Sequence, residues 1–276
     1  MSRLFAALVW LAVPVAGAAQ SFTGWNIRYT LPAGWQVSRT VGRLHVLAST
    51  TEAGAIFLGP GLYATFEEMV ADLGRFYQSM NLQGMPVAQP AQQTIAGLRA
   101  LTATYASQDQ MGQTVHGRYI ALLTPHGTGF ALLAMTTPQH MTQLGATVER
   151  LAASVQAQAP AVNQQAVAAL AGRWMYYAGN ADGVTSSQGG SSHSYEEFVT
   201  FDGRGAFQWQ SSASVSVTTP QDAGGAGRAQ ANNDQGSYTV IGNTLILKGN
   251  QGQLTFELQF AGDRFTADGR TYVRAN

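Results

Sequence analysis

The sequence of 276 residues contains no cysteine. This absence excludes disulfide bonds, thiolate metal sites and a lipid anchor attached to a cysteine. The folded protein is therefore held together by its hydrophobic core and its hydrogen bonds, without a covalent staple.

Charge is also scarce. Charged residues make up 11% of the chain, against about a quarter in typical soluble proteins. The 15 basic residues equal the 15 acidic ones and form no basic run. Phosphate backbones and anionic lipid surfaces are bound by concentrated positive charge, so this composition argues against both as partners.

Only one long apolar run is present, at residues 4–15. Arg3 precedes it and Ala16-Gly17-Ala18-Ala19 follows, which is the three-part pattern of a secretory signal cleaved after Ala18 or Ala19. The run is short for a transmembrane helix, and the alternatives are an uncleaved anchor or a buried helix. We expect a signal peptide at residues 1–19 and a periplasmic or secreted protein that keeps no integral membrane segment after cleavage.

Catalytic and metal-binding motifs are missing as well. His45, His116, His126, His140 and His193 show no metal-ligand spacing, and no G-x-S-x-G motif occurs. We therefore predict no metal, no cofactor and no catalytic residue. A hydrolase would require the fold to gather distant groups, such as His193 with Glu196 or Glu197 and with Asp222 or Asp234.

The chain divides at a small, polar and proline-containing segment, for which we predict a linker at residues 158–168. Residues 20–157 alternate strand and helix patterns. A capping box at Thr65 and Glu68 begins a helix with helically spaced apolar residues, and a second helix is expected from about Pro138 to Val155. This order predicts an α+β sandwich, in which helices pack on an antiparallel sheet.

Short segments of this first domain carry a resemblance. Phe22-Thr-Gly-Trp25, Leu31-Pro-Ala-Gly-Trp35 and Met135-Thr-Thr-Pro138, together with the central helix, resemble the Mog1/PsbP-like sandwich. Members of that superfamily serve mainly as interaction modules. The resemblance implies a protein partner in the cell envelope and carries no catalytic residue onto this chain.

The second domain, residues 169–276, consists of about eight short strand patterns, which predict an up-and-down β-barrel. Most turns are tight, as at Asp202-Gly203 and Asp268-Gly269. Two connections, Gly179 to Ser192 and Thr218 to Gln235, are rich in small and polar residues and are predicted to be long loops. Connections of equal parity lie at the same end of such a barrel, so both loops are expected to ring one mouth.

The opening of this domain, Leu170-Ala-Gly-Arg-Trp174, resembles the start of lipocalins and their calycin relatives. In those families the tryptophan closes the narrow end of the barrel. Gly172 and Trp174 match the short pattern, and the resemblance implies a lipocalin-like barrel.

Alternating apolar residues are expected to point into the barrel, as in Leu254, Phe256, Leu258 and Phe260. Our candidate ligand-binding residues share this expected inward face: Tyr176, Tyr195, Glu197, Trp209, Tyr238 and Phe256. An eight-stranded barrel either holds one small ligand or is filled by its own side chains. Glu197 either orients a ligand inside the barrel or lies at its rim.

Two functions follow from these alternatives. The first is an exported, non-enzymatic binding protein, with a small apolar or amphipathic ligand or a peptide in the barrel and protein contacts through the N-terminal domain. The second is a structural or interaction protein of the envelope with a filled barrel. An exported hydrolase is the third alternative, and the linear sequence offers it no convergent cluster.

Overall fold

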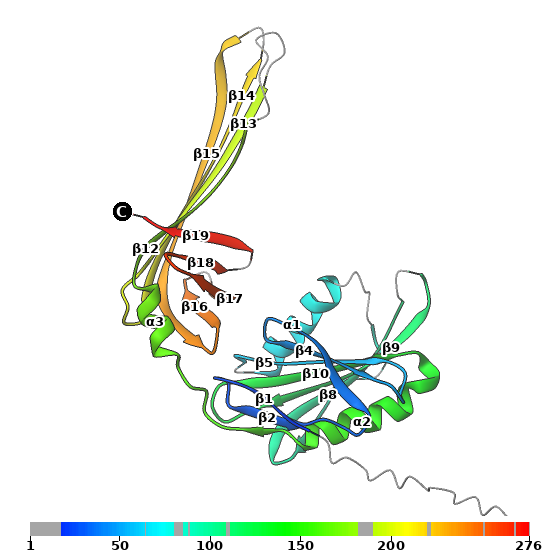
Figure 1. Cartoon of the computed structure of the whole chain (residues 1–276). Helices are drawn as coiled ribbons and strands as arrows, with labels where there is room; N and C mark the ends of the chain where they lie inside the picture. The colour runs from blue at the N-terminus through cyan, green and yellow to red at the C-terminus, as the bar shows by residue number, and fades with distance from the viewer. Residues whose placement is uncertain are drawn as a thin grey trace, which may run out of the picture. The chain divides into compact units, whose positions relative to one another are not determined.

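The computed structural model describes residues 18–63, 65–79, 85–87, 89–108, 111–181, 190–219, 222–250, 252–267 and 269–275. Residues 1–17, which hold most of the predicted signal peptide, lie outside the described residues. The chain forms two compact units, Met1–Ala159 and Pro160–Asn276. The first is an α+β sandwich and the second a closed antiparallel barrel of eight strands, as the sequence predicts (Figure 1).

A mixed-length antiparallel sheet forms the centre of the first unit. Its strand order is β3-β4-β5-β10-β9-β8-β6, and β7 also pairs with β8. The strands are β3 (Trp35–Val41), β4 (Leu44–Ser49), β5 (Ala55–Gly61), β6 (Met85–Pro86), β7 (Ala91–Ile95), β8 (Leu98–Gln108), β9 (Thr114–Leu123) and β10 (Gly129–Thr136). Strands β8 to β10 are the most apolar, and they hold the core of the unit.

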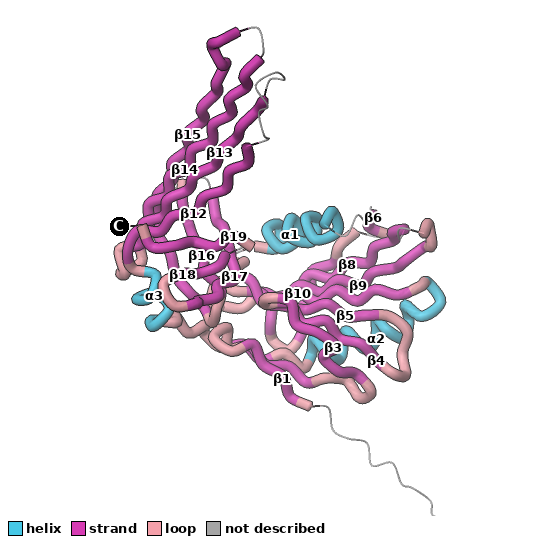
Figure 2. The backbone as a smooth tube through the Cα atoms, turned by 45° about the horizontal axis from the view of Figure 1, so that its top comes forward, coloured by secondary structure: helices cyan, strands magenta, loops and turns pink. Residues whose placement is uncertain are grey.

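Two helices cover opposite faces of this sheet (Figures 1 and 2). Helix α1 (Phe66–Ser79) buries Phe66, Met69 and Leu73 against sheet residues. The backbone N–H of Glu68 donates to the side chain of Thr65 at 3.3 Å, so the predicted cap is present. A short 3-10 turn, η1 (Pro138–His140), leads into α2 (Met141–Ala153), which packs on β9 and β10.

A smaller sheet of order β1-β2-β11 adds to the face that α2 covers. It consists of β1 (Ala19–Phe22), β2 (Ile27–Thr30) and β11 (Gln156–Ala157). Phe22 stacks on His45 with 4.1 Å between ring centres, and the hydroxyl of Tyr29 lies 2.7 Å from Nδ1 of the same histidine. Burial lowers the pKa of His45.

Helix α3 (Gln164–Leu170) lies near the start of the second unit. The side chain of Asn163 caps it by accepting from the backbone N–H of Ala166 at 3.0 Å, and it also donates to the carbonyl of Gly242 at 2.8 Å. Residues 164–168 of the segment predicted as a linker are therefore helical. The cap and the apolar residues Ala166, Val167 and Leu170, which pack on the barrel core, account for this.

The barrel runs up and down through all its strands and closes between its first and its last. The strands are β12 (Gly172–Ala181), β13 (Gly190–Phe201), β14 (Ala206–Thr219), β15 (Asp222–Ile241), β16 (Thr244–Gly249), β17 (Gly252–Ala261), β18 (Arg264–Ala267) and β19 (Arg270–Arg274). Closure rests on two residue pairs only, Trp174 with Arg274 and Met175 with Val273.

The predicted long loop from Thr218 to Gln235 is wrong. Strands β14 and β15 pair from Ala206 and Ser237 as far as Thr219 and Asp222, with one irregularity near Val217. Of the other predicted loop, residues 179–181 and 190–192 are strand, and residues 182–189 lie outside the described residues. Backbone pairing to a neighbouring strand overrides the poor strand propensity of these segments.

Four strands consequently run on past the barrel as an open sheet (Figures 1 and 2). We call this part the extended sheet and define it by its residues: Ala178–Ala181, Gly190–Tyr195, Ala213–Thr219 and Asp222–Gln230. The strand ends Ala181, Gly190, Thr219 and Asp222 lie at the same end of this sheet, as the parity argument predicts. No helix in the described part of the chain is long and apolar enough to cross a membrane.

Candidate functional site

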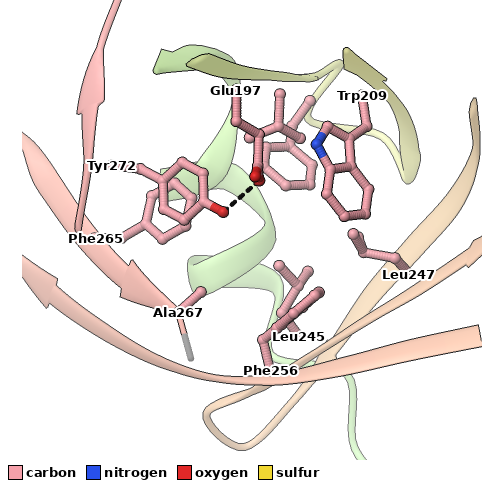
Figure 3. A pocket seen from close by; sticks show the side chains of 10 residues that line it. Glu197, Trp209, Leu245, Leu247, Phe256, Phe265, Ala267 and Tyr272 are labelled. Atoms are coloured by element: carbon pink, nitrogen blue, oxygen red, sulfur yellow. Dashed lines mark hydrogen bonds between the residues drawn. The ribbon is translucent and has the colours of Figure 1, made fainter. Parts of the chain in front are cut away.

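The barrel interior contains a small cavity (Figure 3). Its polar lining consists of Glu197, Trp209 and Tyr272, and the rest is apolar: Val199, Phe201, Leu245, Leu247, Phe256, Phe265 and Ala267. The cavity volume is about 20 Å³. A single water molecule needs about 10–15 Å³, so the space suits one water and no organic ligand.

Glu197 is the central polar residue of this site. It is 2% exposed, so it does not lie at the rim. Its Oε1 accepts from the hydroxyl of Tyr272 at 2.5 Å, and its Oε2 accepts from the hydroxyl of Tyr195 at 2.7 Å. Oε2 also accepts from Nη1 of Arg270 at 2.6 Å. Three donors thus compensate the burial of one carboxylate, and we call these four residues the Glu197 network.

Arg270 joins the network from the solvent side. Its side chain is 42% exposed, whereas that of Glu197 is 3% exposed. The guanidinium lies over the rings of Tyr176 and Tyr195, at 5.4 and 5.5 Å from their centres. Because water reaches this cation, the ion pair is weaker than its distance alone suggests.

The same surroundings act on the tyrosine hydroxyls. Burial, and then the hydrogen bond and charge of Glu197, raise the pKa of Tyr272 well above its ordinary value. Burial and the hydrogen bond to Glu197 raise the pKa of Tyr195 in the same direction. Both hydroxyls therefore stay protonated and remain donors to the carboxylate.

The network lies where the backbone closure of the barrel ends. Tyr176, Glu197 and Ser211 stand opposite one another on β12, β13 and β14, one position beyond the last pair between β12 and β19. Tyr272 and Arg270 come from β19, which no longer pairs with β12 at this level. Their contacts with Glu197 connect the two sides of the barrel where the backbone does not.

The opposite end of the barrel is closed by Trp174 and α3. Trp174 is 1% exposed, and its Nε1 donates to the carbonyl of Leu170 at 2.6 Å. The guanidinium of Arg274 lies 4.5 Å from the centre of the Trp174 ring and donates to the carbonyls of Ala171 and Ala169. Trp174, Arg274 and α3 thus close this end of the barrel.

The structure brings most of the predicted site residues together. Tyr195 and Glu197 belong to the network, and the Tyr176 ring lies beside that of Tyr195. Trp209 and Phe256 line the cavity. Tyr238 lies apart from them. Its hydroxyl donates to the carbonyl of Val167 at 3.2 Å, and its ring packs on Phe201 at the α3 end.

Sequence reasoning missed Arg270 and Tyr272. Both lie on the last strand, where the alternation Arg270-Thr-Tyr272 places them on one face. That alternation could have suggested an inward polar pair. Only the closure of β19 on β12 shows that this pair faces Glu197, 73 and 75 positions earlier in the chain.

One polar atom of the site has no partner. Nε1 of Trp209 is buried and makes no hydrogen bond among the described residues. It belongs to a side chain that lines the same cavity as Glu197 (Figure 3). An unpaired buried N–H is unfavourable, and the cavity beside this donor has room for one water.

The described parts of the chain show no cluster of the acid and base side chains that a hydrolase would require. His193 is exposed on the extended sheet, and Glu196 is exposed on the face opposite to Glu197. Oδ1 of Asp234 accepts from the backbone N–H groups of Gln235 and Asn250, both at 2.8 Å. Among the described residues, no three His, Asp or Glu side chains are placed to hold one metal ion.

Comparisons with known proteins give a partial likeness of fold. No family model matches the chain, and no curated protein matches it significantly in sequence. The solved structures that resemble it include cyanobacterial PsbP (CyanoP) from Synechocystis sp. PCC 6803, at 13% identity and a TM-score of 0.40 over 55% of this chain and 98% of that one.

Two further solved structures give matches of similar extent. LpqN, described as involved in cell envelope biogenesis of Mycobacterium tuberculosis, has 14% identity and a TM-score of 0.32 over 53% of this chain and 86% of that one. A Bacteroides thetaiotaomicron protein has 10% identity and a TM-score of 0.39 over 52% of this chain, and the match spans about half of that protein, 49%. At these TM-scores the likenesses carry no argument about function.

Proposed function

We propose that the chain is an exported, non-enzymatic interaction protein, in which the barrel is a filled scaffold and the extended sheet binds a partner. The observation that carries this proposal is the extended sheet itself. The barrel closes over two residue pairs only. Strands β12 to β15 continue beyond this closure, and strands β16 to β19 do not accompany them.

The filled interior supports the scaffold role. Of the two functions that the sequence leaves open, a ligand cup needs free space, and about 20 Å³ suits one water. The predicted lining residues take up the interior instead. Tyr195 and Glu197 are hydrogen-bonded to each other and Tyr238 is hydrogen-bonded to α3, so all three side chains have partners within the protein.

The edges of the extended sheet support the binding role. The barrel strand β16 pairs with β15 only from Gly236 to Ile241, so Asp222 to Asn232 has β14 on one side and no described strand on the other. An exposed strand edge offers a row of backbone N–H and C=O groups to another chain. Recognition by strand addition uses such a row for affinity.

Site-directed photocrosslinking tests this proposal. A photoreactive phenylalanine analogue replaces Gln230, an exposed residue of the extended sheet, in cells that make the full chain. The matched control carries the analogue at Gln259, an exposed residue of the barrel wall on β17. We expect a discrete adduct from position 230 and none from position 259; no adduct at 230 would refute the proposal.

A small-molecule cup in the barrel is the second candidate, and Trp209 is the observation in its favour. The unpaired Nε1 would donate to a ligand acceptor if the cavity opened. Native mass spectrometry of the full chain, purified gently from its producing cells, tests this candidate. An adduct retained by the native chain and lost in Trp209→Phe would support a cup, whereas a clean mass would support the filled barrel.

A further inference from the structure

We propose that a cleft on the outer wall of the barrel binds a neutral oligosaccharide. The cleft has a volume of about 500 Å³, against about 20 Å³ for the cavity inside the barrel. Small-molecule sites have volumes of about 300–1,000 Å³, so the outer cleft has room for a short sugar chain. Its polar lining consists of Thr200, Asp202, Gln208, Gln235 and Asn250. The cleft shares no residue with the extended sheet, so this inference goes beyond the proposed function.

Three of these polar side chains form one row across the barrel wall. Thr200 on β13, Gln208 on β14 and Gln235 on β15 stand opposite one another in the ladder. All three are exposed, whereas Phe207, the residue before Gln208, is buried. Because successive residues of a strand face opposite sides of the sheet, the row points out of the barrel. Neighbouring strands lie about 4.8 Å apart, so the row presents one polar group about every 5 Å.

Asn250 borders this row from the β16–β17 turn. Oδ1 of Asp234 accepts from the backbone N–H groups of Gln235 and Asn250, both at 2.8 Å, and this holds Asn250 beside Gln235. The cleft thereby gathers three side-chain amides and one hydroxyl. None of these four side chains is hydrogen-bonded to another residue in the described part of the chain. Their donors and acceptors therefore remain available to a ligand.

Asp202 supplies an oriented carboxylate at the end of β13. Its Oδ1 accepts from the backbone N–H groups of Arg204, Gly205 and Ala206 at 2.7, 2.9 and 2.9 Å. The bonds from Ala206 and Arg204 lower the pKa of Asp202, so the group is ionised at neutral pH. No described residue donates to its Oδ2, which is left to accept from a ligand. A charged acceptor forms stronger hydrogen bonds than a neutral one.

The lining argues against the other common classes of ligand. The described residues that line the cleft include no lysine, arginine or histidine, so an anion would meet Asp202 without a compensating cation. The apolar lining consists of Ala206, Phe207 and Gly236, and Phe207 is only 3% exposed, which leaves little apolar surface for a lipid. A peptide that binds by strand addition needs an unpaired edge, whereas β14 is paired on both sides at Gln208.

Hydroxyl groups fit the lining that is present. A hydroxyl both donates and accepts, and a side-chain amide offers a donor and an acceptor side by side, so each amide can bond to two neighbouring hydroxyls. The carboxylate of Asp202 accepts from a further one. A neutral sugar chain carries hydroxyls in series along its length. Because the polar side chains of the cleft also bond to water, we expect weak binding, with a dissociation constant of about 1 mM.

The experiment is a nuclear magnetic resonance titration of the isotopically labelled full chain. The probes are cellopentaose, chitopentaose and maltopentaose, and the comparison probes are sulfate and acetylated tetra-alanine amide. The side-chain amide groups of Gln208, Gln235 and Asn250 give signals of their own. We expect at least one oligosaccharide to shift these signals until they saturate, and we expect neither comparison probe to do so.

Substitutions locate the site. Gln208→Ala and Gln235→Ala each remove one amide from an exposed position, and each should raise the dissociation constant about two- to tenfold. Asp202→Asn keeps an oxygen for the turn and loses the charge, and it should raise the constant about tenfold. Gln210→Ala is the matched control, because Gln210 is exposed on the same face of β14 and is not among the lining residues. It should bind as the native chain does.

The outcomes are decisive in both directions. Saturable shifts that Gln208→Ala weakens and Gln210→Ala leaves unchanged support the inference. No shift with any of the three oligosaccharides overturns it, as does binding that these two variants weaken equally. A response to the peptide alone or to sulfate alone overturns it as well, and would assign the cleft to that class of ligand. The photocrosslinking test of the proposed function is independent of all these results, because it probes the extended sheet.

Discussion

The Glu197 network predicts a measurable loss of stability when its acceptor is removed. In Glu197→Ala, the buried hydroxyl of Tyr272, a residue only 7% exposed, loses its acceptor. An unsatisfied buried donor costs about 1–3 kcal/mol. The side chain of Arg270 is 42% exposed, so water replaces most of its contact with Glu197. Losing this ion pair therefore adds little to the loss of stability. With a small contribution from the cavity left behind, we expect a loss of about 2–4 kcal/mol.

Tyr272→Phe tests the same bond from the other partner. Glu197 keeps two donors in this variant, and losing one hydrogen bond to a charged group costs about 1.5–3 kcal/mol. Because both variants remove the same contact, the double variant should cost less than the sum of the two. A cycle that shows simple additivity would contradict a direct Glu197–Tyr272 interaction.

The raised pKa of Tyr272 gives this prediction a pH signature. Above pH 10 the unfolded chain releases the tyrosine proton while the folded chain keeps it, so the unfolded state binds fewer protons. The free energy of unfolding therefore falls as pH rises above about 10, by up to about 1.4 kcal/mol per pH unit for this group. Below that pH the contribution of Tyr272 is constant. Tyr272→Phe should remove this part of the alkaline slope.

The assay is urea-dependent hydrogen exchange between pH 8 and pH 11, read by mass spectrometry on peptides from β13 and β19. Reading these peptides separates the barrel from the first unit. Tyr177→Phe is the matched control, because Tyr177 is 57% exposed and stands opposite Glu196 in the ladder of β12 with β13. An unchanged alkaline slope in Tyr272→Phe, together with a Glu197→Ala cost below about 0.5 kcal/mol, would refute the reasoning.

Three further predictions concern other parts of the fold. Because burial lowers the pKa of His45, the first unit should lose stability as pH falls below about 6.5, and His45→Gln, which still offers an acceptor to Tyr29, should reduce this acid loss in urea titrations. Asn163→Ala should destabilise the barrel unit by about 1–2 kcal/mol through its lost cap, whereas Asn163→Asp, which keeps the cap acceptor, should cost less in thermal unfolding. Trp174→Phe should cost more than Trp209→Phe in the same assay, because only the Trp174 indole has a hydrogen-bond partner; equal costs would contradict this.

Much of the fold could be predicted from local patterns. Alternation identified the barrel strands, and the capping box at Thr65 identified α1. Alternation is a weaker guide to burial. Leu254 and Phe260 share a face with Phe256 and Leu258 as predicted, but they are 41% and 43% exposed. Alternation reports the face of a strand, whereas burial also depends on how far the barrel extends along it.

The predicted loop at Thr218 to Gln235 was wrong because strand formation there is not a local property. The glycine and alanine of β15 have little strand preference of their own. The ladder to β14, whose Val215, Val217 and Thr218 favour strands, orders the segment. In the same way, the spacing of Tyr195 and Glu197 could be read from the sequence, but their partners on β19 depend on barrel closure.

The unequal lengths of the strands explain why the network and the extended sheet occur together. Strands β12 to β15 contain 10 to 20 residues, whereas β16, β18 and β19 contain four to six. A barrel closes only as far as its short strands reach, so the excess length of the long strands must remain an open sheet with free edges.

At the level where closure ends, the barrel needs a substitute for the missing backbone pairs, and Glu197 with its donors from β19 provides it. It follows that Glu197→Ala should loosen β18 and β19 and leave the pairing of β14 with β15 intact. Exchange protection in the extended sheet should therefore be insensitive to this substitution, while that of β19 is lost. Equal loss in both would mean that the extended sheet depends on barrel closure, and its role as an independent binding surface would fail.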